Sequence, residues 1–177
     1  MFDVVQARAT IVEIPDYPES GVVFKDVTPL FANAQAFAFV VESMAKQFER
    51  AKITAVVGIE ARGFILGGAL AQLMHVGFVP VRKLGKLPRE TFRADYLLEY
   101  GSDTIEIHTD SLSASDNVLI VDDVLATGGT VSAAIDVIEQ TGATVSGFAV
   151  LLNLDFLGGA EKIARTHPQV RVLSVLD

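Results

Sequence analysis

Two adjacent carboxylates followed by a pair of glycines form the part of this sequence best suited to chemistry. The segment Val118–Thr130 reads VLIVDDVLATGGT, and a helical pattern begins at Val131. Backbone N–H groups at a glycine-rich helix start can approach an anion closely, and the helix dipole adds positive potential there. Asp122 and Asp123 would repel a phosphate, so they require another partner, either sugar hydroxyls or a hydrated metal ion. The combination predicts a site for a ribose 5-phosphate.

Better-known phosphate-binding loops do not fit this segment. A Walker A loop ends in Gly-Lys-Ser or Gly-Lys-Thr, and no lysine lies between Asp123 and Glu161. A dinucleotide-binding fingerprint needs G-x-G-x-x-G soon after a strand, and Gly128-Gly129 does not supply it. The simplest alternative is a buried strand, a polar turn and an N-capped helix. Paired acids and a diglycine serve no packing purpose, however, which favours the phosphate site.

The same segment resembles the phosphoribosyl-pyrophosphate (PRPP) signature of the type I phosphoribosyltransferase family. Four further blocks are similar to the adenine-specific members of that family, in the same order and at similar spacing. They are GVVFKDVTP from Gly21, GIEARGF from Gly58, GKLP from Gly85 and LEYG from Leu98. The resemblance covers roughly Ile11 to Leu173. It implies an enzyme of purine salvage that transfers the 5-phosphoribosyl group from PRPP to N9 of adenine, giving AMP and pyrophosphate.

The resemblance divides the PRPP-binding residues into three groups. The 5-phosphate would be bound by Ala126, Thr127, Gly128, Gly129 and Thr130. The ribose hydroxyls would be bound by Asp122 and Asp123. The pyrophosphate would be bound by Arg62, Lys83 and Lys86, and a non-proline cis peptide is common in the loop that contains Arg62. On residue types alone, the arginine could instead be a surface residue and the lysines part of a solvated basic loop.

Mg²⁺ is the cofactor that the resemblance implies. It would bridge pyrophosphate and ribose oxygens mainly through the substrate and water, so no side chain is a predicted direct ligand. Asp122 and Asp123 could reach the ion indirectly. The three histidines of the chain show no metal-ligand spacing and are expected to be structural.

Base binding and proton transfer are implied for two other segments. Phe24 would stack on the purine, while backbone groups of Val23 and Lys25 would match its hydrogen-bonding edge. Glu99 would accept or relay the N9 proton, and Tyr100 would help to close the site. On residue types alone, Phe24 could also be a core aromatic beside a turn, and Glu99 a plain exposed strand residue.

Composition limits the possible partners and locations of the chain. A net charge of −8 argues against a nucleic-acid-binding surface, so anionic substrates must be bound by local features. The absence of cysteine excludes disulfides and thiolate zinc sites and is compatible with the cytoplasm, and no secretory signal is recognised. The mean hydropathy of +0.42 is high for a soluble monomer, yet no apolar run reaches the ~20 residues of a membrane helix. A subunit interface, and with the family likeness a homodimer, is therefore expected.

Two other functions compete with adenine transfer. The nearest is the same fold acting on xanthine, hypoxanthine or guanine. The other is a regulator that binds PRPP without turnover. A regulator would be expected to carry a basic nucleic-acid surface or an added DNA-binding domain, and this acidic sequence offers neither.

Apolar runs that predict strands alternate along the chain with helical patterns. Strands are expected over Ile53–Ile59, Val76–Val81, Val118–Val121, Val145–Leu152 and Val170–Val175. Helices are expected over Ala34–Arg50, Ile65–Met74, Val131–Gln140 and Gly159–Thr166. The alternation predicts an α/β fold with a mainly parallel sheet and helices on both faces, as in type I phosphoribosyltransferases. Ligands would bind at the carboxyl ends of the strands.

Two elaborations of a single domain, residues 1–177, are expected. Residues 1–29 would form a short N-terminal hood that reads the base. Residues 84–108 contain no helical pattern and would form a flexible β-hairpin flap, turned at Gly101-Ser102-Asp103. Non-core segments of this length between sheet strands are often functional.

Overall fold

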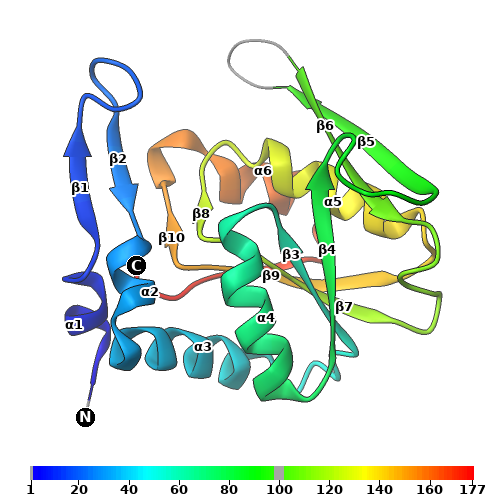
Figure 1. The fold of residues 1–177 in the computed structure, drawn as a ribbon, viewed down its shortest axis with the longest axis horizontal. Helices are drawn as coiled ribbons and strands as arrows, with labels where there is room; N and C mark the ends of the chain where they lie inside the picture. Colours follow the sequence, from blue (N-terminus) through cyan, green and yellow to red (C-terminus); the bar gives the residue numbers. More distant parts are fainter. Residues whose placement is uncertain (1, 98–101) are drawn as a thin grey trace.

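A seven-stranded sheet forms the centre of the computed structural model, which describes residues 2–97 and 102–177 (Figure 1). The strand order is β11-β9-β7-β3-β4-β6-β5. Neighbours from β11 to β4 are parallel, whereas β6 is antiparallel to both β4 and β5. The predicted α/β fold with a mainly parallel sheet is confirmed. The bounds are β3 Ala55–Ile59, β4 Gly77–Lys83, β5 Thr91–Leu97, β6 Ser102–His108, β7 Asn117–Val121, β9 Thr144–Val150 and β11 Arg171–Ser174.

Helices cover both faces of the sheet. Helices α3 (Ala34–Phe48) and α4 (Arg62–Met74) pack on one face, and α5 (Gly129–Glu139) and α6 (Gly159–Thr166) pack on the other. Alternate side chains of β7 enter the two hydrophobic cores. Because both faces of this strand are buried, its sequence is a continuous apolar run rather than an alternating one. The predicted buried strand at this position is confirmed.

Two helices begin earlier than the sequence pattern predicts. Helix α4 begins at Arg62 rather than Ile65, and α5 begins at Gly129 rather than Val131. Glycine weakens helix propensity, so Gly63 and Gly129 conceal the first turns from a pattern based on apolar spacing. Both helix N-termini therefore lie nearer to the carboxyl ends of β3 and β7, the edge where ligands bind in sheets of this kind.

The hood comprises α1 (Val4–Arg8), the antiparallel pair β1 (Val12–Pro15) and β2 (Val23–Asp26), and α2 (Thr28–Ala32). Its helices pack against α3, while the β1–β2 hairpin extends beside the main sheet (Figure 1).

A small parallel pair, β8 (Val124–Leu125) and β10 (Leu152–Asn153), lies outside the main sheet, and the 3₁₀ turn η1 (Asp155–Leu157) follows β10. Of the helices in the described ranges, none has the length and apolar character needed to cross a bilayer.

The flap contains the predicted β-hairpin, formed by β5 and β6. The predicted turn is wrong for Ser102 and Asp103, which are the first two residues of β6 and pair with Leu97 and Tyr96. Serine and aspartate favour turns because their side chains bond to nearby backbone. Here the Asp103 carboxylate instead lies 3.0 Å from the Lys83 ammonium, so an ion pair to β4 accounts for an acid within the strand.

Candidate active site

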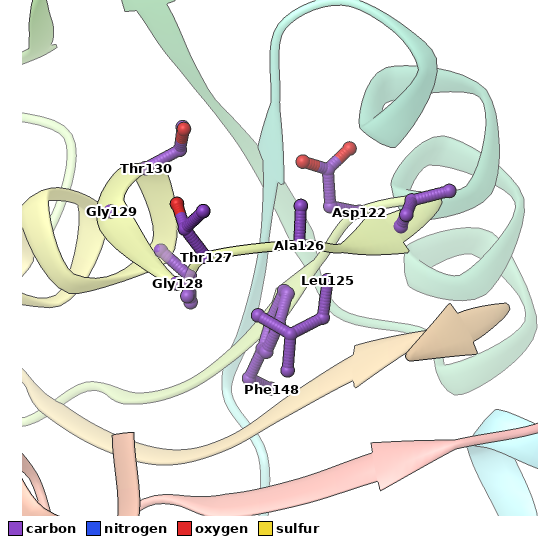
Figure 2. Close-up of a pocket in the computed structure, with 10 residues that line it drawn as sticks. Asp122, Leu125, Ala126, Thr127, Gly128, Gly129, Thr130 and Phe148 are labelled. Atoms are coloured by element: carbon purple, nitrogen blue, oxygen red, sulfur yellow. The ribbon is translucent and has the colours of Figure 1, made fainter. Parts of the chain in front are cut away.

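The phosphate loop, residues 126–130, leads from β8 into α5 beyond the carboxyl end of β7. Gly128 has a φ of +75°, and the helix begins at the next residue. The loop and Asp122 line a cavity of about 80 Å³. Figure 2 shows the Thr127 and Thr130 hydroxyls and the Asp122 carboxylate on the same side of the loop. The five residues predicted to bind the 5-phosphate thus line one cavity at a helix N-terminus, where an anion is favoured.

A glycine that sequence reasoning missed packs directly against the phosphate loop. A Cβ on Gly159 would lie 2.2 Å from the carbonyl oxygen of Ala126 and 3.0 Å from the nitrogen of Gly128. A Cβ on Gly128 would in turn lie 3.0 Å from the carbonyl oxygen of Gly159. Backbone contacts backbone here, and no side chain fits between the loop and α6. The glycine pair Gly158-Gly159 at the start of a predicted helix was the available signal for the glycine, although it did not indicate which segment packs against it.

The two adjacent aspartates after β7 have different environments. Asp123 is 4% exposed, and its carboxylate accepts a hydrogen bond from Nε of Arg62. Asp122 is half-buried beside the phosphate loop, and its Oδ1 accepts the backbone N–H of Asp123 at 2.9 Å. Burial and the neighbouring Asp123 carboxylate raise the pKa of Asp122 well above its usual value. Asp123 is therefore already paired, while Asp122 is the carboxylate presented to the cavity.

Residues 60–62, the predicted pyrophosphate loop, contact Asp123 through Arg62. The Glu60–Ala61 peptide is cis, as the family resemblance implied, and Arg62 is the first residue of α4. A Cβ on Gly63 would lie 2.6 Å from the carbonyl oxygen of Val121, so glycine permits the close approach of α4 to the end of β7. Within residues 2–97 and 102–177, only Nε of the Arg62 guanidinium forms a hydrogen bond. Its terminal nitrogens can therefore donate to phosphate oxygens.

The predicted base-reading residues line a second cavity, of about 280 Å³, that also reaches the aspartates. The Phe24 ring centroid lies 5.7 Å from the guanidinium carbon of Arg62 and 5.3 Å from the Tyr17 ring centroid. Phe24 belongs to neither hydrophobic core. Sequence reasoning missed Leu154, which follows β10 and lines this cavity. The cavity is lined by Val22, Val23, Phe24, Lys25, Arg62, Asp122, Asp123, Val124, Ala126 and Leu154.

The predicted flap residues are only partly placed by the structure. Lys83 ends β4, and its ammonium pairs with Asp103, which lowers the pKa of the Asp103 carboxyl. Lys86 is exposed in the loop that follows, and its backbone N–H donates to Glu106. Glu99 and Tyr100 lie outside the described residues, so their proposed roles stay predictions.

An ion pair that sequence reasoning missed connects the pyrophosphate loop to the base of the flap. Nε and Nη2 of Arg82 donate to the two carboxylate oxygens of Glu60 at 3.1 and 3.0 Å. The backbone N–H of Lys83 donates to the same carboxylate at 3.1 Å. The hydrogen bond from Arg82 lowers the pKa of Glu60. The sequence signal for this ion pair was an acid directly after β3, Glu60, and a base near the end of the next strand, Arg82 on β4.

Within the part of the chain that the structure describes, one other cluster has the residue types of a metal site. Ligand atoms of Asp136, Glu139 and His167 lie within 4.8 Å of one another, but none of these residues lines either cavity described above. Nε2 of Gln169 donates to Glu139 at 3.2 Å, and Nε2 of His167 lies 3.9 Å from Asp136. These contacts join α5 to the chain after α6.

Comparison with known proteins establishes the class to which this fold and site belong. The phosphoribosyl transferase domain matches residues 30–176, and the chain belongs to the phosphoribosyltransferase family. Relatives within that family include adenine phosphoribosyltransferases. The Salinispora arenicola enzyme is 52% identical over 159 residues, which cover 90% of this chain and 85% of the relative. The Maricaulis maris enzyme is 54% identical over 156 residues, which cover 88% and 89%.

Solved structures give the same assignment and confirm the type I fold. The adenine phosphoribosyltransferase from Thermoanaerobacter pseudethanolicus superimposes with a TM-score of 0.92 at 43% identity, covering 98% of both chains. The Saccharomyces cerevisiae enzyme, complexed with adenine and an imino-altritol bisphosphate, gives a TM-score of 0.91 at 38% identity, also covering 98% of both chains. The likeness therefore includes the hood, which the domain match at residue 30 leaves out.

Proposed function

We propose that this protein transfers the 5-phosphoribosyl group of PRPP to N9 of adenine and so produces AMP and pyrophosphate in purine salvage. One observation carries the proposal: the base-reading strand β2, the aspartates after β7 and Arg62 line a single cavity. The phosphate loop shares Asp122 with that cavity. A base and a ribose 5-phosphate could therefore occupy adjoining parts of one site. The adenine bound in the yeast relative supports the choice of base.

The residues of this chain would act mainly by positioning and electrostatics. The bond between C1 of the ribose and the pyrophosphate oxygen breaks through a transition state with positive charge at C1 and growing negative charge on the pyrophosphate, while the bond from C1 to N9 of adenine forms. Arg62, Lys83 and Lys86 would donate to the departing pyrophosphate. The phosphate loop would hold the 5-phosphate, and Asp122 and Asp123 would hold the ribose hydroxyls, which fixes C1 relative to the base.

Base binding and proton transfer complete the proposed roles. Phe24 would stack on adenine, and backbone groups of Val23 and Lys25 would bind its edge. The proton lost from N9 would pass to Glu99 as the new bond forms, and Tyr100 would cover the site against water.

The cavity that Asp122 shares with Arg62 suits a hydrated Mg²⁺ better than the smaller one at the phosphate loop, because Arg62 is a proposed pyrophosphate ligand. Asp122 lines it, and among the described residues its Oδ2 accepts no hydrogen bond. Mg²⁺ prefers oxygen ligands and retains water, so Asp122 would hold it through a bound water molecule. The ion would supply positive charge to the diphosphate of PRPP. Asp123 would act less directly, because Arg62 already pairs with it.

A turnover assay tests the proposed function. The protein is incubated with PRPP, Mg²⁺ and each purine base in turn, and nucleotides are separated by chromatography. AMP from adenine alone is the expected product. IMP, GMP or XMP as the main product would assign the site to another base, and tight PRPP binding without any nucleotide would identify a regulator.

We further propose a homodimer that covers the outer face of α4. Helices packed on one side only are normally polar on the other, yet Ile65 and Leu73 on α4 are 47% and 43% exposed. Phe78 on β4 is also 36% exposed, and its ring contacts Phe64 on α4. A second copy of this chain is the occupant that suits a self-complementary apolar face.

Sedimentation velocity tests the dimer. Ile65→Asp with Leu73→Asp should convert it to a monomer. Val5→Asp, at an apolar side chain that is 71% exposed on α1, should leave it intact. A monomeric wild-type protein would overturn this part of the proposal.

The cytoplasm is the proposed location, which suits a chain without cysteine.

A further inference from the structure

Glu106 is a buried carboxylate that the proposed reaction does not use directly. It lies on β6 and is 1% exposed. The strand register places it opposite Arg82 on β4 and Arg93 on β5, and Nε of Arg93 lies 3.5 Å from its Oε2. Burying a carboxylate is unfavourable unless it is paired and hydrogen-bonded. The hydrogen bonds of its two carboxylate oxygens show which segments this buried charge holds together.

One oxygen of Glu106 binds the loop at the base of the flap. Oε1 accepts the backbone N–H groups of both Lys86 and Leu87, each at 3.1 Å. Successive N–H groups that converge on one anionic oxygen form a nest, and hydrogen bonds to a charged acceptor are the stronger kind. Nη1 of Arg82 donates to the carbonyl oxygen of Lys86 at 3.3 Å. The residue is thus held through both its N–H and its carbonyl, directly after Gly85 turns the chain with a φ of +80°.

The other oxygen of Glu106 contacts the flap itself. Oε2 accepts the hydroxyl of Thr91 at 3.2 Å, at the first residue of β5. A single buried side chain therefore connects the Lys86 loop to both strands of the hairpin. By contrast, the Lys86 side chain is exposed, so its reach toward a ligand depends on where this backbone is held.

We propose that Glu106 is a positioning residue: it fixes the backbone of Lys86 so that the Lys86 ammonium meets the pyrophosphate of PRPP. This inference rests on the pyrophosphate role proposed above for Lys86. A loop that is already ordered loses less conformational entropy when PRPP binds. Its donors are also in place when charge develops on the pyrophosphate.

Three substitutions at position 106 separate this role from general stability. Glu106→Ala removes both oxygens, and Glu106→Asp keeps the charge but withdraws it from the loop. Glu106→Gln keeps an oxygen that can accept the two N–H groups, while its amide can donate to the Thr91 hydroxyl. Thr91→Val is the matched control, because it removes a partner of Oε2 and leaves the Oε1 contacts unchanged.

The readouts are amide hydrogen exchange at Lys86 and Leu87 and the KM values for PRPP and adenine. We expect Glu106→Ala and Glu106→Asp to accelerate exchange strongly at Leu87 and less at Lys86, whose N–H also donates to the carbonyl oxygen of Lys83 at 3.3 Å. KM for PRPP should rise about tenfold, the effect of losing roughly one charge-assisted hydrogen bond. KM for adenine should change little. Glu106→Gln should restore both readouts, and Thr91→Val should leave KM for PRPP within about twofold.

The outcomes distinguish this inference from the proposed function. Unchanged exchange in both Ala and Asp variants, or faster exchange with an unchanged KM for PRPP, would overturn the positioning role. If Glu106→Ala does not fold, the Asp and Gln variants carry the comparison alone. Absence of AMP formation by the wild type would refute the proposed function instead. Exchange, together with calorimetric titration of pyrophosphate and Mg²⁺, would then still test whether Glu106 orders an anion-binding loop.

Discussion

The Arg62 guanidinium donates to the Asp123 carboxylate across 61 positions of the chain and so joins the pyrophosphate loop to the end of β7. The side chain of Asp123 is 5% exposed, whereas that of Arg62 is 43% exposed. Arg62 is therefore both a proposed pyrophosphate ligand and the counter-ion of a buried acid. The pair therefore links the proposed pyrophosphate ligand to one of the proposed ribose ligands within the protein itself.

Removing Arg62 should reduce stability and PRPP binding together. Arg62→Ala leaves the buried Asp123 carboxylate without its partner, and we expect a loss of about 1–2 kcal/mol in the free energy of unfolding. This is less than the ~3–5 kcal/mol for a fully buried pair, because Arg62 is partly exposed to solvent. Urea unfolding measures the loss. The double variant Arg62→Ala/Asp123→Asn should recover stability without recovering a low KM for PRPP; equal stability of the single and double variants would contradict the pairing.

Asp122 should favour function at the expense of stability. Its folded pKa is raised by burial and by Asp123, so the charged form destabilises the folded state at neutral pH. This destabilisation is absent below the unfolded pKa of about 3.9, where the carboxyl is protonated in both states. It grows as the pH rises toward the folded pKa and is complete above that pKa. Asp122→Asn should therefore raise the melting temperature by roughly 2–4 °C at pH 7 and by less toward pH 4. Turnover should fall at least about a hundredfold, given the change in transition-state binding that one such ligand supplies.

A lower melting temperature for Asp122→Asn at pH 7 would show that the carboxylate stabilises the fold. The Asn side chain keeps an oxygen for the Asp123 N–H, so the substitution changes charge and little else. Circular dichroism melts at several pH values provide the comparison.

The elements and the phosphate loop were predictable from sequence because they depend on local patterns. The run from Val118 to Val121 is apolar because both faces of β7 are buried, and the diglycine indicates a helix entrance even though α5 begins at Gly129 rather than at the predicted Val131. The contacts of Gly159 with Ala126 and of Glu106 with Lys86 were not predictable in this way. They join segments that the fold brings together, and no local periodicity records such a pairing.

The position of Phe24 predicts a selective effect on base binding. Its ring lines the cavity beside Arg62 and lies outside both cores. Phe24→Ala should raise KM for adenine about tenfold, since an aromatic stacking contact and its buried area are both lost. KM for PRPP should rise less than about threefold, which steady-state kinetics with each substrate varied in turn would measure. Phe24→Leu keeps most of the side-chain volume, so its KM for adenine should lie between those of the wild type and Phe24→Ala. A larger effect on PRPP than on adenine would place the base elsewhere.

The backbone contact between Gly159 and the phosphate loop predicts that one methyl group at the start of α6 will disturb ligand binding. A Cβ at position 159 would overlap the Ala126 carbonyl and press on the Gly128 nitrogen, and neither backbone atom can move without shifting the loop. Gly159→Ala should weaken AMP binding at least about tenfold and cost about 1–3 kcal/mol of stability. Gly77→Ala is the control, because a Cβ there meets no atom within 4 Å. The control should bind AMP normally and gain about 0.4–1 kcal/mol. Calorimetric titration of AMP decides the matter: normal affinity in Gly159→Ala would mean that the loop tolerates displacement and that α6 does not set its position.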